Sequence, residues 1–361
     1  MIQSEEHEEN LMKIARKMIR APQSCPVDED GNPTRTYLEY LSLMYDPEVA
    51  KIVHHLEPLP KMLSITKFAK KLNLDKKEII QKLEGVRKKG FVFGLGRQYC
   101  LPNPVLIWDA PFIFSINAKE PDIKKFAELS RKSYLEEKYY KRWQNSWRGT
   151  PYMRVLTVEE EIEPGHEIQP VEEIYSLIDN NSSFALLECP CRLRAEIEGN
   201  RECKGKYPIH NCISVGASAE GLLAIGDPAP KPITREEVKE IVKKSVDVGL
   251  VLTTDNSAKI SNLICSCCEC CCGMLRGLTK LDNPRAIAKA NFIASVDKEA
   301  CVACGTCAEE RCKFGAIVIN DVAEINEDRC MGCGLCAAKC PNDAIKMQRL
   351  EREKIPGLAK I

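Results

Sequence analysis

The stretch CMGCGLCAAKCP (residues 330–341) carries four cysteines separated by two, two and three residues, and a proline follows the fourth. An earlier stretch, CVACGTCAEERCKF (residues 301–314), repeats this arrangement 29 residues upstream. The C-terminal part of the chain is therefore an internal repeat built around eight cysteines, and the spacing of those cysteines decides how this part folds.

The spacing has a chemical reason. Three cysteines separated by pairs of residues form a tight loop that wraps one face of an iron–sulfur cube, while the fourth lies beyond a turn and ligates the other cube. The second copy follows the bacterial C-x2-C-x2-C-x3-C-P pattern without departure. The repeat predicts two [4Fe-4S] clusters, the first bound by Cys301, Cys304, Cys307 and Cys340 and the second by Cys330, Cys333, Cys336 and Cys312.

The first copy departs from the pattern at two positions. Four residues instead of three separate Cys307 from Cys312, and Lys313 stands where proline is usual. A loop accommodates one extra residue. The assignment of Cys312 as a ligand therefore depends on a spacing that differs by one residue from the bacterial pattern. Zinc is the alternative metal, since pairs of C-x-x-C also bind Zn²⁺, but two tandem triplets with a distal fourth cysteine are far more typical of iron–sulfur ligation.

Ten further cysteines lie between residues 189 and 272. Six of them crowd into ICSCCECCCGM (residues 264–274). Adjacent side chains tend to point apart, and ten thiols exceed the four ligands of one cube, so we expect one or two further clusters. One assignment of ligands takes one cluster from the first four cysteines and another from the last six. An equally good assignment mixes the two groups. Zinc in place of a cluster is a further alternative. The candidate ligands are Cys189, Cys191, Cys203, Cys212, Cys265, Cys267, Cys268, Cys270, Cys271 and Cys272.

The whole chain points to metal ligation and not to a disulfide framework. It has 361 residues and 20 cysteines, most of them a few residues apart, and its N-terminus lacks the basic and apolar regions of a secretory signal. We therefore expect a reducing, cytoplasmic location. No run of apolar residues is long enough for a transmembrane helix. Cys25 and Cys100 stand alone and are expected to be small core residues or free thiols.

Charge gives no indication of a nucleic-acid or membrane partner, because Lys+Arg and Asp+Glu both number 52. Residues 121–147 carry Tyr134, Tyr139, Tyr140, Trp143 and Trp147 among basic residues. We expect a helix that packs these rings on a core, in preference to rings that stack on nucleic-acid bases.

The pattern of elements predicts an α+β multidomain protein. Residues 1–57 form a helical N-terminal segment, residues 58–115 a winged-helix-like module, residues 116–290 a cysteine-rich α/β middle domain, and residues 291–350 a dicluster ferredoxin fold. The 58–115 module rests on a helix around Phe68, a second helix with Asp75 as N-cap, and then a short hairpin. Ile79, Leu83 and Val86, with Ile80 beside them, are expected to form the buried side of the second helix.

A family resemblance covers roughly residues 150–345. The C-x-C-R motif at Cys189, two downstream cysteines, the G-L-V stretch at Gly249, the I-C-x-C-C-x-C-C-C element and the C-terminal repeat together resemble multi-cluster ferredoxin-like iron–sulfur proteins of anaerobic bacteria and archaea. The resemblance implies electron transfer in anaerobic metabolism. Arg192, which follows the C-x-C, either donates hydrogen bonds to cluster sulfur or is solvated.

Three functions follow from these patterns. The first is an electron relay to a redox protein partner, a flavoprotein or an oxidoreductase subunit. The second is an oxidoreductase with a substrate- or thiol-reactive site among the middle cysteines, because some thiols exceed the ligands that clusters need. The third is a redox-sensing DNA-binding regulator, which the mixed charge of the second helix of the 58–115 module (DKKEII, residues 75–80) disfavours.

Overall fold

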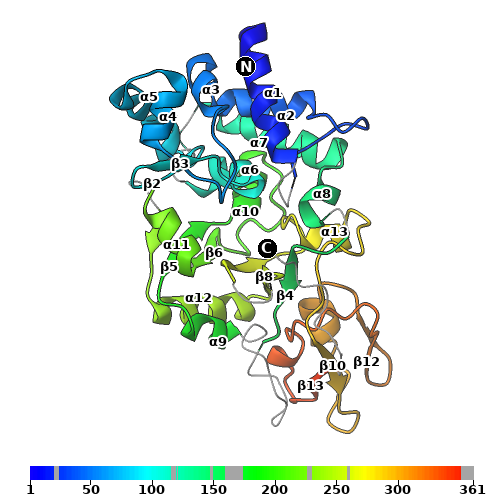
Figure 1. The fold of residues 1–361 in the computed structure, drawn as a ribbon. Helices are drawn as coiled ribbons and strands as arrows, with labels where there is room; N and C mark the ends of the chain where they lie inside the picture. Colours follow the sequence, from blue (N-terminus) through cyan, green and yellow to red (C-terminus); the bar gives the residue numbers. More distant parts are fainter. Residues whose placement is uncertain are drawn as a thin grey trace. The chain divides into compact units, whose positions relative to one another are not determined.

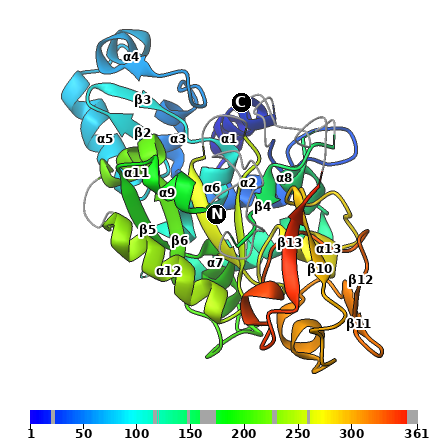
Figure 2. The ribbon, with the colours of Figure 1, turned by 90° about the horizontal axis from the view of Figure 1, so that it is seen from below.

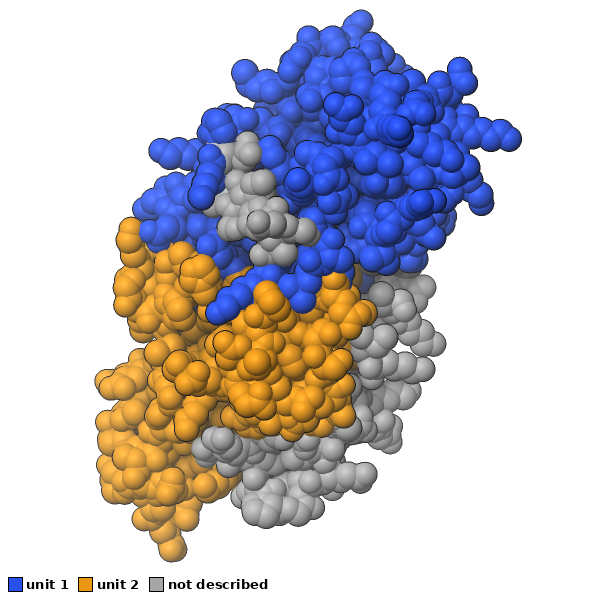
Figure 3. Space-filling view, turned by 90° about the vertical axis from the view of Figure 1, so that its left-hand side faces the viewer, with its two compact units in different colours: residues 1–146, 188–200, 221–231 blue, residues 147–187, 201–220, 232–361 orange. Residues whose placement is uncertain are grey.

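The computed structural model divides the chain into two compact units (Figure 3). The first unit comprises residues 1–146, 188–200 and 221–231, and the second comprises residues 147–187, 201–220 and 232–361. The structure describes residues 1–19, 24–114, 119, 121–146, 149–158, 174–225, 230–257 and 261–350.

The first unit is mainly helical (Figure 1). Three short strands form one antiparallel sheet in the order β1-β3-β2. The elements of this unit are α1 (Glu5–Ile19), α2 (Arg35–Met44), α3 (Pro47–Val53), β1 (Leu63–Ser64), α4 (Ile65–Leu72), α5 (Lys76–Lys88), β2 (Phe93–Leu95), β3 (Gln98–Cys100), α6 (Pro104–Ile113), α7 (Ile123–Arg131), a π-helical turn (Lys132–Glu136), α8 (Tyr140–Gln144) and α10 (Pro190–Ile197).

Local capping fixes the helices of the 58–115 segment. The Asp75 side chain accepts a hydrogen bond from the Lys77 backbone N–H at 2.7 Å, so it caps α5 as predicted. Ile79 and Leu83 are buried on that helix, whereas Ile80 is 39% exposed. The expectation that Ile80 belongs to the buried side was therefore wrong, because only the stripe through Ile79 and Leu83 meets the core.

The aromatic residues of α7, the π-helical turn and α8 pack inward. Tyr134, Tyr139, Tyr140 and Trp143 are all at most 8% exposed. Tyr134 and Trp143 meet edge to face, with ring centroids 5.9 Å apart. The predicted core packing is confirmed for these four rings; Trp147 lies outside the described residues.

A six-stranded sheet in the order β4-β8-β9-β6-β5-β7 forms the centre of the second unit. Neighbours β4/β8, β8/β9 and β9/β6 are antiparallel. The elements around the sheet are β4 (Met153–Val155), α9 (Ile174–Asp179), β5 (Phe184–Glu188), β6 (His210–Val215), α11 (Gly216–Leu223), β7 (Lys231–Pro232), α12 (Arg235–Asp247), β8 (Val251–Asp255), β9 (Leu263–Cys267) and α13 (Leu275–Thr279).

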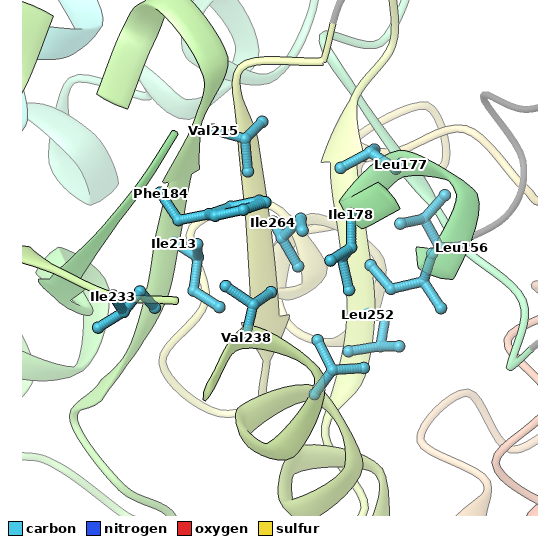
Figure 4. Packing of buried hydrophobic residues seen from close by; sticks show 12 residues of the cluster. Leu156, Leu177, Ile178, Phe184, Ile213, Val215, Ile233, Val238, Leu252 and Ile264 are labelled. Carbon is cyan, nitrogen blue, oxygen red and sulfur yellow. The ribbon is translucent and has the colours of Figure 1, made fainter. Parts of the chain in front are cut away.

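Helices α9 and α12 cover one face of this sheet (Figure 2). α12 starts with a capping box, in which Thr234 and Glu237 each bond the other's backbone N–H. Figure 4 shows the apolar layer between helices and sheet, to which β6 contributes Ile213 and β9 contributes Ile264. Because strand side chains alternate, the neighbours of these two isoleucines face the opposite side of the sheet.

The C-terminal module of the second unit holds the cysteine repeat. β10 (Phe292–Val296) pairs antiparallel with β13 (Ile345–Arg349), and β11 (Ile317–Ile319) forms a hairpin with β12 (Ala323–Ile325). Gly332, between two cysteines of the second copy, has a φ of +72°, and a Cβ there would lie 2.2 Å from the Phe292 carbonyl oxygen. Only glycine fits this close approach of the cysteine loop to β10.

These observations confirm a mixed α/β protein with cysteine-rich regions. The finer division into four segments stays a prediction. Within the described residues, none of the helices combines the length and the apolar character needed to span a bilayer.

Candidate metal centres

Two cavities lie in the C-terminal module, and each is lined by four cysteines. The wall of the first cavity contains Val302, Ile319 and Ala323 beside the cysteines. Its four cysteines are Cys301, Cys304, Cys307 and Cys340. The structure thus brings the first three cysteines of the first copy together with the last cysteine of the second.

The second cavity is the counterpart of the first. Its wall contains Ile317, Met347 and Arg311. Its four cysteines are Cys312, Cys330, Cys333 and Cys336. Both quartets are the crossed sets expected from the repeat, although which sulfurs bind metal stays a prediction.

The extra residue of the first copy is absorbed in a wider helical turn. Between Cys307 and Cys312 the chain forms a π-helical turn (Cys307–Arg311), closed by the Cys312 N–H bonding the Cys307 carbonyl oxygen at 3.0 Å. The second copy has a 3₁₀ turn (Ala337–Lys339) at the same place. Cys312 and Cys340 leave these turns with nearly the same backbone angles, φ −74° and −71°, so both reach across to the other half.

Backbone N–H groups point at the cysteine sulfurs. The Ala316 N–H donates to Cys312 Sγ at 3.2 Å, and the Ala344 N–H donates to Cys340 Sγ at 3.3 Å, each from four residues downstream. The Ala323 N–H donates to Cys301 Sγ at 3.4 Å. Four thiols, an apolar wall and N–H donors to the sulfurs are what a [4Fe-4S] cluster requires, so the residues present fit that group.

The two cavities differ in exposure. At the first, Cys304 is exposed, and hydrogen bonding from the Thr306 backbone N–H lowers its pKa. At the second, burial raises the pKa of Cys333 to about 12 and that of Cys336 well above its usual range. Cys304 is thus the one exposed cysteine among the eight that line the two cavities.

Sequence comparison gives independent support to this reading. Residues 323–346 match the 4Fe-4S binding domain family. The match includes all four cysteines of the second copy. It supports at least one [4Fe-4S] cluster in the C-terminal module and an iron–sulfur electron-transfer role. No curated protein and no solved structure matches the chain.

Three middle cysteines gather on the sheet face opposite α9 and α12. The pairing of Ile213 with Ile264 sets Cys212 against Cys265, and their sulfurs lie 3.6 Å apart. Cys267, two residues along β9 from Cys265, is within hydrogen-bonding range of the Cys265 sulfur. Alternation along β9 therefore explains why the C-S-C spacing places both thiols on one face.

Four other cysteines form a tight group, which we call the 203 quartet. It consists of Cys203, Cys268, Cys270 and Cys271, whose sulfurs all lie within 4.8 Å of one another. The structure therefore mixes the two sequence groups. Adjacent Cys267 and Cys268 belong to different groups, as expected, but adjacent Cys270 and Cys271 share one.

Cys189 and Cys191 belong to the first unit. Cys189 ends the connection from β5, and Cys191 lies in the first turn of α10, where a hydrogen bond between the two thiols raises the pKa of Cys189. Arg192 is only 1% exposed, so the alternative that it is solvated was wrong. α10 is fixed to α6 by a buried ion pair, with Arg194 Nη2 and Asp109 Oδ1 2.8 Å apart.

The remaining cysteines stand outside these groups. Cys272 Sγ accepts the backbone N–H groups of Met274 and Leu275 at 3.4 and 3.5 Å. Cys25 and Cys100 are completely buried, and burial raises the pKa of each to about 12. Burial confirms the expectation that these two thiols belong to the core.

Sequence reasoning missed Arg311, which precedes Cys312 and lines the second cavity. Its guanidinium donates to the Leu335 carbonyl oxygen at 3.1 Å and to the Asp247 and Val246 carbonyl oxygens at 3.0 and 2.6 Å. The last two end α12, where a cation is favourable because of the helix dipole. A basic residue directly before the fourth cysteine of each copy was the available signal.

Proposed function

We propose that this protein transfers electrons and holds two [4Fe-4S] clusters in its C-terminal module. The observation that carries the proposal is the pair of cavities, each lined by the four cysteines that the crossed pattern requires. A bound [4Fe-4S] cluster supplies one-electron exchange with little rearrangement.

The chain's own residues prepare both sites. Cys301, Cys312 and Cys340 receive backbone N–H groups, which stabilise negative charge on sulfur. Apolar residues around each cavity limit the entry of water, and the guanidinium of Arg311 adds positive charge at the second cavity. Each of these features bears on reduction potential and none of them supplies a catalytic acid or base.

Two exposed residues at the first cavity suggest where a redox protein partner docks. Cys304 is exposed, and Val302 beside it is 61% exposed. An apolar side chain at the mouth of the cavity suits a transient protein contact close to the metal ligands. We propose a flavoprotein or an oxidoreductase subunit as the partner, with electrons passing through this face.

The test of the proposal is iron and sulfide analysis of the full chain, purified without oxygen. Two clusters in the module give about eight irons and eight sulfides per chain. About twelve of each would indicate a further cluster among the middle cysteines. A chain with zinc at these levels and no sulfide would overturn the proposal.

An oxidoreductase is the second candidate function. It is favoured by the group of Cys212, Cys265 and Cys267, because three close thiols that bind one metal ion leave its fourth ligand position for a substrate. A metal centre at these cysteines whose spectrum changes when a substrate is added would support this candidate.

We propose that the β1-α4-α5-β2-β3 segment is a winged-helix-like docking module. α5, in the position of a recognition helix, begins with Lys76, Lys77 and Glu78 and so mixes both charges over its first turn. A base-reading helix is more consistently basic or amide-rich there, so DNA is the less favoured partner.

A further inference from the structure

The 203 quartet differs from the quartets of the C-terminal module in its dimensions. Cys203 and Cys271 have their sulfurs 3.7 Å apart, and the sulfurs of Cys270 and Cys271 are 3.6 Å apart. All four sulfurs lie within 4.8 Å of one another, and among the described residues no other group of three or more possible metal ligands is as compact.

These dimensions distinguish two kinds of metal centre. Four thiolates at about 2.3 Å from one tetrahedral ion have their sulfurs about 3.8 Å apart. In a [4Fe-4S] cube the thiolates bind four different irons and point outward from its corners, so their sulfurs lie farther apart. The measured separations match the single ion.

The backbone around the quartet is held by bonds that do not involve sulfur. Thr279 Oγ1 donates to the Glu269 carbonyl oxygen at 3.0 Å, and Lys280 forms an ion pair with Glu202, next to Cys203. The Glu269 carboxylate, between Cys268 and Cys270, lies 3.6 Å from Lys313 Nζ, whose side chain is 7% exposed. The loops that carry all four cysteines are thus fixed from several sides.

A metal cation at this position would allow the buried thiols of the quartet to ionise. Cys203, Cys268 and Cys271 are at most 6% exposed. Buried thiolates need a compensating positive charge. The Arg201 side chain hydrogen-bonds to Cys203, which supplies one such charge to one sulfur and leaves the others for a metal.

We propose that Cys203, Cys268, Cys270 and Cys271 bind a single tetrahedral metal ion, Zn²⁺ or Fe²⁺, as a mononuclear tetrathiolate centre. Both ions are selected by four soft thiolate ligands in tetrahedral geometry. The site is separate from the two cavities of the C-terminal module and does not depend on the electron-transfer proposal.

The test compares metal content in the full chain, purified without oxygen, between the native protein and Cys271→Ser and Cys203→Ser. Each variant is expected to lose one equivalent of zinc, or one of iron, with no loss of sulfide. Cys272→Ser is the matched control, since Cys272 is adjacent to Cys271 but outside the quartet, and it is expected to keep the full metal content.

X-ray absorption of the native protein keeps the proposal testable if a variant fails to fold. Zinc at the site gives four sulfur neighbours at about 2.3 Å with no metal–metal distance. Iron at the site gives, after oxidation, the EPR signal of isolated high-spin Fe³⁺. Loss of about four irons and four sulfides in the variants, disulfides between quartet cysteines in the native protein, or unchanged metal in the variants would each overturn the proposal.

Discussion

Replacing Cys336 with serine is expected to remove about four of the eight irons of the C-terminal module and to destabilise the module without unfolding it. Cys336 is 8% exposed and belongs both to the second cavity and to the apolar core around Phe292, Ile345 and Met347. A module of about 60 residues has too small a core to be very stable by itself. The free energy of cluster binding therefore contributes directly to the free energy of folding of the module. The measurement is iron content together with hydrogen exchange of β10 and β13.

Two further variants make this prediction specific. Cys304→Ser should remove iron from the other quartet with a smaller effect on exchange, because Cys304 is exposed. Cys340→Ser should remove the same EPR signal of the reduced protein as Cys304→Ser, and not the signal that Cys336→Ser removes. This is expected although Cys340 is close to Cys336 in sequence. The crossed assignment would be wrong if Cys340→Ser and Cys336→Ser removed the same cluster.

Replacing Arg311 with methionine is expected to destabilise the second unit by about 3 kcal/mol and to lower the reduction potential of the cluster in the second cavity. The substitution leaves the carbonyl oxygens of Leu335, Asp247 and Val246 without their charged donor. The substitution also removes a positive charge from the cavity wall. Loss of that charge favours the oxidised cluster and so lowers its reduction potential. Denaturant unfolding measures the first effect and a potentiometric EPR titration the second.

Lys339→Met is the matched control, because Lys339 precedes Cys340 as Arg311 precedes Cys312. Lys339 Nζ also meets α12, 2.7 Å from Asp247 Oδ1, but both side chains are more than 40% exposed. Its loss should cost about 0.5 kcal/mol and leave both potentials near their native values. Equal effects of the two substitutions would show that Arg311 acts as a surface charge only.

Local chemistry was readable from the sequence. The capping box of Thr234 and Glu237 was predictable because both partners lie within four residues. In the same way, Cys265 and Cys267 are two residues apart in the I-C-S-C stretch of β9, and side chains two apart in a strand lie on the same face of the sheet. The repeat predicted the grouping of the eight C-terminal cysteines because the crossed pattern is a property of the spacing itself.

Contacts between segments far apart in the sequence could not be predicted from the sequence. The approach of Cys203 to Cys271 joins residues 68 positions apart, and that of Arg311 to Asp247 joins residues 64 apart. Neither partner carries a local signal for the other. Ile80 shows the same limit, since which apolar residues of a helix are buried depends on what packs against it.

The central claim is that two [4Fe-4S] clusters in the C-terminal module carry electrons. Its most direct test is an anaerobic reductive titration of the full chain, followed by EPR with spin quantification. We predict two S = 1/2 signals from the module per chain, broadened by their mutual interaction. Cys336→Ser is expected to remove one signal and the broadening of the other. A chain that takes up no electrons, or a module that yields only one signal unaffected by Cys304→Ser or by Cys336→Ser, would contradict it.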